Sequence, residues 1–356
     1  MQKKQYFCIM NILLTGVGAP GVQGTLYALR ELRGHIIGVD ADKWAVGQYL
    51  CDEFLTIAKA NDKENYLNDL RCICEKKHID CIVPQNTAEL TILAEYQREF
   101  EDKGVKILIS SKQSIDDANN KYNLLCKAQE LGIETGRFCL CADFETLREQ
   151  VELRCQLGQQ TVVKPPCGNG SRGVRVIVSD KKWDRKSDFY NTKPSSLFCT
   201  LEELHAIIGN TFPSLLIMDY LPGEEYTVDV LRTDTNFVAI PRKREVMRSG
   251  ITFRASLEKN ERIIQDCKCL AEVMDLQYCF GFQFKKNAEG KPVLLECNPR
   301  VQGTMVMSVM AGANIIAEAV RHCMQLPPRE MNIQWDTRLV RYWGAVGVNE
   351  SGVVKI

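Results

Sequence analysis

The chain has 356 residues, of which 45% are hydrophobic and 25% are charged. This length exceeds one ordinary core and predicts two or three domains of a globular protein. The 45 basic residues balance the 45 acidic ones, and the chain has no apolar run of about 18 residues, the length that spans a membrane. We therefore expect neither a nucleic-acid partner nor a membrane.

Sixteen cysteines are scattered through the chain without a C-x-x-C pair, and the four histidines stand in no metal-ligand spacing. These patterns argue against a zinc site. A chain of this size does not need disulfides to fold, so we expect mostly buried thiols in a reducing, cytoplasmic setting.

Residues 11–40 predict a strand, a glycine-rich turn, a helix and a second strand that ends at Asp40. Gly16, Gly18, Gly21 and Gly24 with this acid resemble a loosely spaced dinucleotide fingerprint. A sharp strand-to-helix reversal requires glycines for steric reasons alone. Nicotinamide binding, and with it an NAD-dependent oxidoreductase, is therefore an alternative hypothesis.

The following residues continue the alternation of strand and helix, which predicts a doubly wound parallel sheet over residues 1–112. The expected elements are strands at 54–57, 81–84 and 106–109 and helices at 66–76 and 89–100. Further along, residues 179–196 predict an exposed insertion, 258–274 an amphipathic helix, and 337–348 a final strand.

Residues 161–178, TVVKPPCGNGSRGVRVIV, predict a strand, a glycine-rich tip and a second strand. Lys164 ends the first strand, and Gly168, Gly170, Ser171 and Gly173 leave the backbone N–H groups uncovered, as in a loop that covers phosphates. The lysine precedes the glycines, so this is not a P-loop. The alternative is a hairpin with a flexible tip.

Residues 242–254 contain five cationic side chains within what we expect to be a strand region. They form either a solvated edge strand, whose charges prevent edge pairing, or a contact for an anionic substrate. Arg248 and Arg254 are the candidates for that contact.

Residues 280–304, FGFQFKKNAEGKPVLLECNPRVQGT, predict a β-hairpin with its turn at 287–290. Glu296, Asn298 and Arg300 are spaced by two and point to one face. If the turn centres between Glu289 and Gly290, Gln283 faces Glu296. A carboxylate and two amides suit Mg²⁺, and the arginine suits a transferring phosphoryl group; the alternative is a solvated sheet face with an incidental ion pair.

Four segments in this order resemble the ATP-grasp superfamily: a helix that Lys121 opens and LGIET closes, VVKPPCGNGSRGV, MDYLPGEEYTVDV, and FQF…LLECNPRVQGT. The resemblance covers residues 11–330 and is greatest to the halves of carbamoyl-phosphate synthase large chains and their single-unit relatives. It implies an α/β and α+β chain: a Rossmann-like (pre-ATP-grasp) domain at 1–112, then a two-lobed ATP-grasp fold. The small lobe, with its linker helices, would occupy 113–218 and the large lobe 219–356.

The resemblance also implies roles for individual residues. Lys121 and Lys164 match the lysines that contact the ATP phosphates, and the glycine loop at 168–173 matches the segment that closes over them. Met218, Asp219 and Tyr220 match the hinge whose backbone binds adenine, and Glu225 the ribose-binding acid.

On the hairpin, Gln283, Glu296 and Asn298 match the family's Mg²⁺ ligands, and Arg300 the arginine that stabilises the transferred phosphoryl group. Most relatives have an acid where Gln283 stands, although the synthase-like branch uses glutamine.

The activity implied is that of an ATP-dependent carboxylate–amine ligase. With Mg²⁺ (or Mn²⁺) as the metal, such an enzyme transfers the γ-phosphoryl group of ATP to a carboxylate and so forms an acyl phosphate. An amine then displaces the phosphate, and the products released are ADP and phosphate. The partners are then a small carboxylate and a small amine, and the resemblance implies a homodimer. Synthase-like activation of bicarbonate or a carbamate is the alternative within the family. The likeness weakens the nicotinamide hypothesis, because in this family the first glycine turn lines the substrate side.

Overall fold

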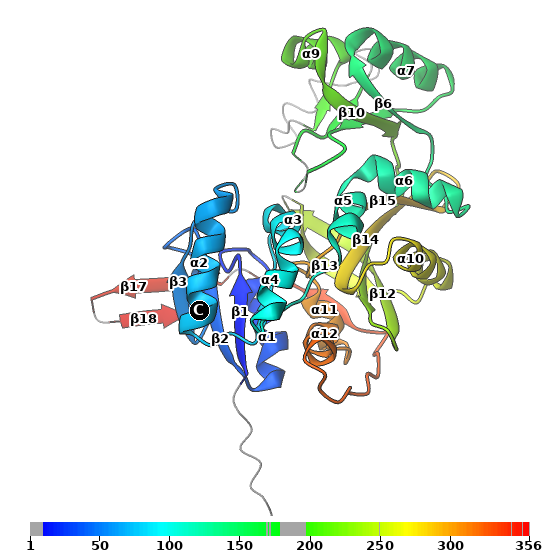
Figure 1. Cartoon of the computed structure of the whole chain (residues 1–356). Helices are drawn as coiled ribbons and strands as arrows, with labels where there is room; N and C mark the ends of the chain where they lie inside the picture. Colours follow the sequence, from blue (N-terminus) through cyan, green and yellow to red (C-terminus); the bar gives the residue numbers. More distant parts are fainter. Residues whose placement is uncertain are drawn as a thin grey trace, which may run out of the picture. The chain divides into compact units, whose positions relative to one another are not determined.

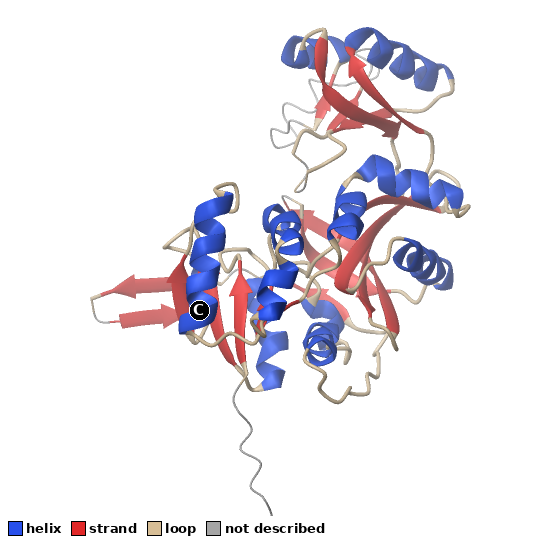
Figure 2. Ribbon diagram, in the orientation of Figure 1, coloured by secondary structure: helices blue, strands red, loops and turns tan. Residues whose placement is uncertain are grey.

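The computed structural model describes residues 10–168, 170, 172–178, 197–248, 250–342, 344–350 and 352–355. The chain divides into two compact units. Unit 1 comprises Met1–Asp116, Tyr226–Gln283 and Cys297–Ile356, and unit 2 comprises Asp117–Glu225 and Phe284–Glu296. Figure 1 labels the elements and Figure 2 colours them by type. The division into 1–112, 113–218 and 219–356 stays a prediction, and the insertion over 179–196 lies outside the described residues.

The first sheet lies in unit 1 and is parallel throughout, in the order β3-β2-β1-β4-β5. This confirms the predicted doubly wound sheet. Ile12, Leu13 and Leu14 of β1 are all fully buried, as expected for a strand covered on both faces. The strands are β1 (Asn11–Thr15), β2 (His35–Asp40), β3 (Glu53–Thr56), β4 (Cys81–Val83) and β5 (Lys106–Ile107).

Short loops join these strands to the helices beside them. The helix predicted over 89–100 is two helices that meet at Tyr96, and a capping box of Asn86 and Glu89 starts the first of them. The helices are α1 (Val22–Leu29), η1 (Arg30–Leu32), η2 (Val46–Tyr49), α2 (Lys63–Lys76), α3 (Thr87–Glu95), α4 (Gln97–Asp102) and α5 (Lys112–Asn119).

Unit 2 contains a second sheet in the order β6-β10-β7-β8-β9. Side chains cap two of its helices: Asp143 accepts from the Thr146 N–H, and Thr200 forms a capping box with Glu203. The strands are β6 (Phe138–Asp143), β7 (Thr161–Lys164), β8 (Arg175–Ile177), β9 (Phe198–Cys199) and β10 (Thr211–Asp219). The helices are α6 (Lys121–Glu130), α7 (Phe144–Gln156) and α9 (Leu201–Ile208).

The third sheet has six strands in the order β15-β14-β11-β12-β13-β16. It contains the predicted hairpin, whose turn closes where the Asn287 N–H donates to the Lys291 carbonyl. The strands are β11 (Glu225–Arg232), β12 (Phe237–Arg248), β13 (Ile251–Leu257), β14 (Tyr278–Lys286), β15 (Pro292–Asn298) and β16 (Arg338–Val340). The helices are α10 (Glu261–Val273), α11 (Val306–Met310) and α12 (Ile315–Cys323).

The prediction of one final strand over 337–348 is wrong. The segment forms β16 on the edge of the six-stranded sheet and then β17 (Val346–Asn349), which pairs with β18 (Gly352–Lys355) in a separate hairpin. Val340 and Tyr342 are 73% and 79% exposed, and the described residues that follow up to 350 are exposed or only partly buried. Leu339 is buried in β16, but no buried face extends beyond it to hold the whole segment in a single strand.

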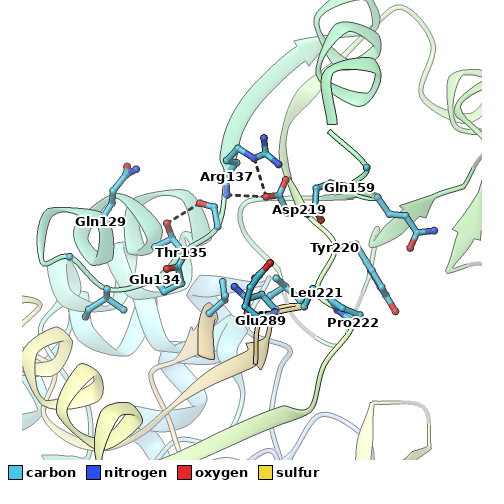
Figure 3. Close-up of a pocket in the computed structure, with 18 residues that line it drawn as sticks. Gln129, Glu134, Thr135, Arg137, Gln159, Asp219, Tyr220, Leu221, Pro222 and Glu289 are labelled. Atoms are coloured by element: carbon cyan, nitrogen blue, oxygen red, sulfur yellow. Dashed lines mark hydrogen bonds and ion pairs between the residues drawn. The ribbon is translucent and has the colours of Figure 1, made fainter. Parts of the chain in front are cut away.

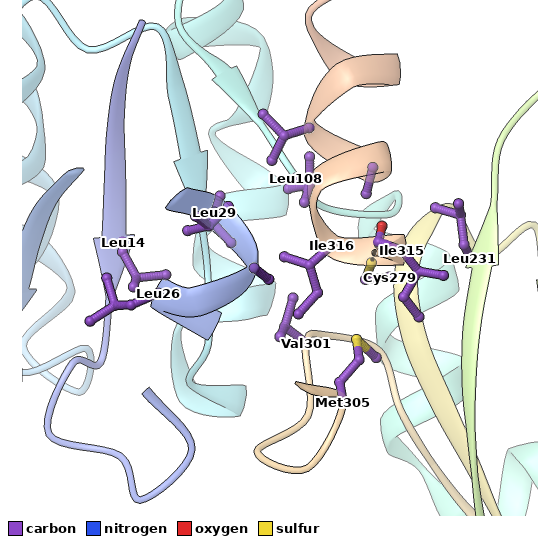
Figure 4. Packing of buried hydrophobic residues seen from close by; sticks show 14 of the residues in the cluster. Leu14, Leu26, Leu29, Leu108, Leu231, Cys279, Val301, Met305, Ile315 and Ile316 are labelled. Carbon is purple, nitrogen blue, oxygen red and sulfur yellow. Dashed lines mark hydrogen bonds between the residues drawn. The ribbon is translucent and has the colours of Figure 1, made fainter. Parts of the chain in front are cut away.

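The largest core lies in unit 1 and joins its two sheets (Figure 4). Leu14 and Leu26 belong to the same cluster as Val301, Met305 and Ile316. The N-terminal sheet therefore shares its core with the C-terminal part of the chain. Within the described residues, no helix combines the length and the apolar content needed to cross a membrane.

Candidate active site

Two buried lysines and one glutamate converge in unit 2. Lys121 opens α6 directly after its Asn120 cap, and its Nζ lies 3.7 Å from Glu296 Oε2. Lys164 ends β7, and its Nζ donates to the carbonyl of Leu295 over 3.4 Å. The structure thus brings together three residues that are far apart in the sequence and that the resemblance assigns to ATP and Mg²⁺.

The electrostatics of this cluster favour a polyanion. Burial lowers the pKa of Lys164 to about 8, an effect opposed by the charges of Glu296 and Glu225 and reinforced by the charge of Lys121. The two carboxylates offset only part of the cost of burying the Lys164 ammonium, so its pKa stays below the ordinary value. The phosphates of a nucleotide would bring further negative charge to both ammonium groups, so the residues present fit this ligand.

The glycine-rich loop attaches to the start of α6. The Lys121 N–H donates to the Pro166 carbonyl over 2.8 Å, and Lys121 Nζ donates to the Gly168 carbonyl over 2.7 Å. Gly168, Gly170 and Gly173 have φ angles of 129°, 64° and 74°, which L side chains rarely adopt, so the loop requires glycine at these positions. Cys167 in this loop is exposed, and Ser171 lies outside the described residues.

The predicted hinge follows β10, and part of its backbone is already hydrogen-bonded. The Asp219 N–H donates to the Arg137 carbonyl, and the Tyr220 N–H donates to the Gln160 carbonyl. The Asp219 carboxylate lies 3.2 Å from both the Arg137 and the Arg154 guanidinium groups. Adenine binding by Met218, Asp219 and Tyr220 stays a prediction. Because these two N–H groups already donate to carbonyls, adenine would bind to other backbone groups of the hinge.

A cavity of about 700 Å³ borders the same hinge (Figure 3). Asp219 lies one strand position from buried Met218 and therefore on the opposite face of β10, where its carboxylate meets α7. Neither Lys121 nor Lys164 lines the cavity, so it is distinct from the lysine cluster. Its lining residues are Gln129, 132–137, 158–160, 219–222, 287–289 and Val293.

The hairpin residues occupy the two strands predicted for them: Gln283 lies on β14, and Glu296 and Asn298 lie two positions apart on β15. The closing pair Asn287–Lys291 centres the turn on Glu289. If strand pairing continues from this closing pair without a bulge, the register is shifted by one residue from the one that would place Gln283 opposite Glu296. That pairing and the Mg²⁺ ligand roles stay predictions.

Arg300 follows β15 and contacts the N-terminal part of the chain. Its Nε donates to Thr87 Oγ1 over 2.8 Å, at the start of α3, and its Nη1 donates to the Val301 carbonyl over 2.9 Å. The segment after the hairpin is therefore attached to helix α3 of the N-terminal part. The role of Arg300 toward a phosphoryl group stays a prediction.

The two substrate candidates from the basic stretch lie at its surface. Arg254 is 57% exposed and pairs with Glu245 over 2.8 Å, whereas Arg248 lies over the Phe253 ring at 4.8 Å. The structure instead buries Arg242, which is 1% exposed. Sequence reasoning missed this residue because every arginine in the stretch looks alike until the partner strands are known.

The glycines of the first turn have packing roles. A Cβ on Gly21 would lie 2.2 Å from the Gly303 Cα, and one on Gly24 would lie 2.6 Å from the Val306 Cβ. The Asp40 carboxylate accepts hydrogen bonds from the N–H groups of Gly18 and Asp42. These contacts account for the glycines and the acid without a dinucleotide, which counts against the oxidoreductase alternative.

Two family models match the chain. Residues 211–342 match an ATP-grasp family of a biosynthetic pathway with the Ter operon. Residues 12–108 match the PylC-like N-terminal domain. The first match contains the hinge and the hairpin, and the second contains the parallel sheet.

Formate-dependent phosphoribosylglycinamide formyltransferase from Bacteroides fragilis is 29% identical over 169 residues, or 48% of this chain and 40% of the relative. The chain thus matches less than half the length of this curated relative. Among solved structures, N5-carboxyaminoimidazole synthetase from Staphylococcus aureus, complexed with ADP, covers 91% of this chain and 80% of its own at 17% identity and a TM-score of 0.66. Campylobacter jejuni biotin carboxylase, in a β-γ-ATP complex, covers 92% and 73% at 18% identity and a TM-score of 0.66. The chain therefore has the ATP-grasp fold, preceded by a parallel-sheet domain that is similar to the PylC-like N-terminal domain.

Proposed function

We propose that this protein is an ATP-dependent carboxylate–amine ligase that acts through an acyl phosphate. The convergence of Lys121, Lys164 and Glu296 carries the proposal, because it brings two buried ammonium groups suited to phosphates together with a carboxylate suited to Mg²⁺. The matched family models and the nucleotides named for the two solved neighbours support it.

The proposed chemistry assigns each residue a positioning or charge-balancing role. Lys121 and Lys164 bind the ATP phosphates, and Arg300 offsets charge on the transferred group. Glu296, Asn298 and Gln283 are the residues that would hold Mg²⁺, which neutralises phosphate charge when bound. No residue of the set needs to form a covalent bond, because phosphoryl transfer depends mainly on position and charge.

The reaction has two steps. A carboxylate oxygen attacks the γ-phosphorus of ATP, the bond to the β-phosphate oxygen breaks, and ADP leaves. The amine nitrogen then attacks the acyl carbon and displaces inorganic phosphate, and the amine loses a proton. The first step converts the carboxylate oxygen, a poor leaving group, into part of a phosphate group, which leaves readily.

A second candidate replaces the organic carboxylate with bicarbonate. The names of the two solved neighbours, N5-carboxyaminoimidazole synthetase and biotin carboxylase, favour this reading. The same lysines and hairpin residues would then activate bicarbonate as carboxyphosphate, a mixed anhydride, in the manner expected of a synthase-like branch.

Release of ADP tests both candidates. Purified protein with Mg-ATP is incubated with amino acids and other small carboxylates in the presence of an amine panel, with and without bicarbonate. ADP that requires an organic carboxylate supports the ligase, and ADP that requires bicarbonate supports the second candidate. ADP formed in neither arm rejects both. Light scattering tests the proposed homodimer separately.

A further inference from the structure

A buried carboxylate in unit 1 accepts hydrogen bonds from four donors that the proposed mechanism does not use. Glu89 on α3 is 3% exposed. Its Oε1 accepts from the Thr15 hydroxyl and, over 3.1 and 2.9 Å, from the N–H groups of Gln85 and Asn86. Its Oε2 accepts from the Tyr66 hydroxyl over 2.7 Å. This Glu89 network joins α3 to β1, to α2 and to the segment that follows β4.

A helix cap explains only part of the Glu89 network. In a capping box the glutamate accepts from the N–H group of the cap residue, here Asn86, and a glutamate at the surface can do this. Burial raises the pKa of Glu89, and the hydrogen bonds from Thr15 and Tyr66 oppose that change. Because the Gln85 and Asn86 N–H groups point at one oxygen, the segment between β4 and α3 has a fixed path.

This fixed segment leads directly to Thr87, which contacts Arg300. Thr87 is the first residue of α3, after the Asn86 cap. The Asn86 side chain accepts from the Ala88 N–H over 3.1 Å, so the cap forms without the Thr87 hydroxyl. That hydroxyl oxygen instead accepts from Arg300 Nε over 2.8 Å, across 213 positions of sequence. The N-terminal part of the chain therefore holds an arginine that follows β15.

Two hydrogen bonds define the plane of the Arg300 guanidinium group. Nε donates to Thr87, and Nη1 donates to the Val301 carbonyl over 2.9 Å. Val301 is the next residue in the chain, so Thr87 is the partner that relates this plane to the first sheet. The backbone is held as well, since a Cβ on Gly21 would lie 2.2 Å from the Gly303 Cα.

The helix dipole does not account for the contact between Arg300 and Thr87. The N-terminus of a helix carries partial positive charge, which disfavours a cation beside it. A hydroxyl that accepts from Nε fixes the direction of the guanidinium group without neutralising its charge. The contact therefore suits an arginine that has to keep both its charge and its orientation.

We propose that Thr87, held by the Glu89 network, is a positioning residue that orients the Arg300 guanidinium group for the transferred phosphoryl group. The proposal rests on the proposed function, from which the role of Arg300 comes. Phosphoryl transfer depends on position and charge, so a guanidinium group that turns freely would stabilise the transferred group less well. The first sheet then supports the chemistry through an arginine that it holds in place.

Thr87→Val tests the proposal, because it keeps the shape of the side chain and removes the hydroxyl. With the substrate that supports ADP release, we expect kcat to fall about tenfold while the KM for ATP stays within about twofold. Thr87→Ser keeps a hydroxyl and should recover most of the lost rate. Thr91→Val is the matched control and should leave kcat unchanged, since Thr91 on the same helix donates to Asp116 over 3.2 Å.

A double-mutant cycle separates positioning from a general effect on the fold. In the Arg300→Ala background, Thr87→Val should change kcat by less than about twofold, because the group that it positions is gone. A structural role alone predicts the same loss in both backgrounds. An unchanged kcat in Thr87→Val, or an equal loss with and without Arg300, overturns the proposal.

Nucleotide binding gives a second readout that needs no substrate. Calorimetry compares Mg-ADP with the magnesium complex of the β,γ-imido analogue of ATP, which carries the γ-phosphoryl group and does not transfer it. Thr87→Val should reduce the preference for the analogue about threefold or more at unchanged ADP affinity, and Glu89→Gln should act in the same direction. An unchanged preference in both variants assigns Thr87 and Glu89 to the fold alone.

The positioning role and the ligase activity can fail separately. A reduced preference in Thr87→Val without ADP from any substrate retains the positioning of Arg300 and rejects the ligase. ADP formation with full kcat in Thr87→Val retains the ligase and rejects the positioning.

Discussion

At the scale of single residues, Glu296 interacts with both lysines of the cluster. It is the carboxylate beside Lys121 and the first charge that opposes the lowered pKa of Lys164. Its loss leaves two buried cations without their nearest counter-charge. Because it is also the predicted metal ligand, its structural and chemical roles coincide.

Glu296→Gln should therefore reduce ADP formation by about 10²-fold or more, since the amide removes the anionic ligand at unchanged size. The measurement is ADP release with the substrate found in the panel. Glu289→Gln, at the exposed tip of the same hairpin, is the matched control and should retain activity. Equal rates for the two variants would reject the role given to Glu296.

Lys164 predicts how nucleotide binding depends on pH. Its pKa is about 8 in the folded protein against an ordinary 10.5, so the ammonium that binds phosphate is progressively lost above pH 8. Nucleotide affinity should fall as pH rises through this value, and binding near pH 8 should take up a proton. Calorimetric titrations of ATP in buffers of different ionisation enthalpy measure both effects.

The same shift has a consequence for stability of opposite sign. Between pH 8 and 10.5 the unfolded chain binds more protons at this lysine than the folded chain does. The burial of Lys164 therefore lowers the free energy of unfolding by its full amount below pH 8 and by less above it.

Lys164→Met should abolish the pH dependence of nucleotide binding between pH 8 and 10.5. Persistence of that dependence in the variant would assign it to another group.

At the scale of elements, the first turn and the segment after the hairpin approach each other backbone to backbone at Gly21 and Gly303. Gly21→Ala should destabilise the protein by about 1–3 kcal/mol, because its Cβ meets backbone that cannot rotate away. Gly347→Ala is the matched control: its Cβ would contact only the Val354 carbonyl, at 3.9 Å, and its effect should stay within about 0.5 kcal/mol. Urea unfolding measures both, and a tolerated Gly21→Ala would show that the turn can shift.

Local patterns predicted the elements that have a buried face of their own. The amphipathic helix over 258–274 is α10, whose Ile263, Cys267 and Leu270 are buried, and the hairpin turn closes where its glycine predicted. Prediction failed where partners come from distant strands. The edge position of Val340 and the burial of Arg242 against Asp229 both depend on strand pairing that no local pattern contains.

At the scale of the molecule, the N-terminal sheet is not an independent body within unit 1. Asn314, the cap of α12, donates from Nδ2 to the Ala28 carbonyl at 3.0 Å and to Glu31 at 2.7 Å. The contact joins residues 286 positions apart. Local patterns in the sequence therefore predicted the sheet but not the C-terminal segment that completes its core. The residues of the lysine cluster are also far apart in the sequence, so only the family resemblance predicted that they meet.

Ile316→Ala should therefore destabilise the first sheet from a distance. Ile316 is fully buried on α12 in the cluster that includes Leu14 of β1, and its truncation should cost about 2–5 kcal/mol. Hydrogen exchange of the β1 amides measures the loss, which should match that of α12. Ile207→Ala, at a 66% exposed position on α9, should leave these amides unchanged. Full protection of β1 in Ile316→Ala would instead show that the sheet folds by itself.

The exposed position of Cys167 supplies a chemical reporter for the lysine cluster. The residues on either side of it, Pro166 and Gly168, accept hydrogen bonds from Lys121 through their carbonyls. Burial raises the pKa of the Cys74, Cys267 and Cys279 thiols, so these cysteines react slowly. Alkylation followed by mass spectrometry can therefore follow this loop in the unmodified chain. Mg-ATP should slow labelling of Cys167 and leave that of exposed Cys72 and Cys155 unaltered.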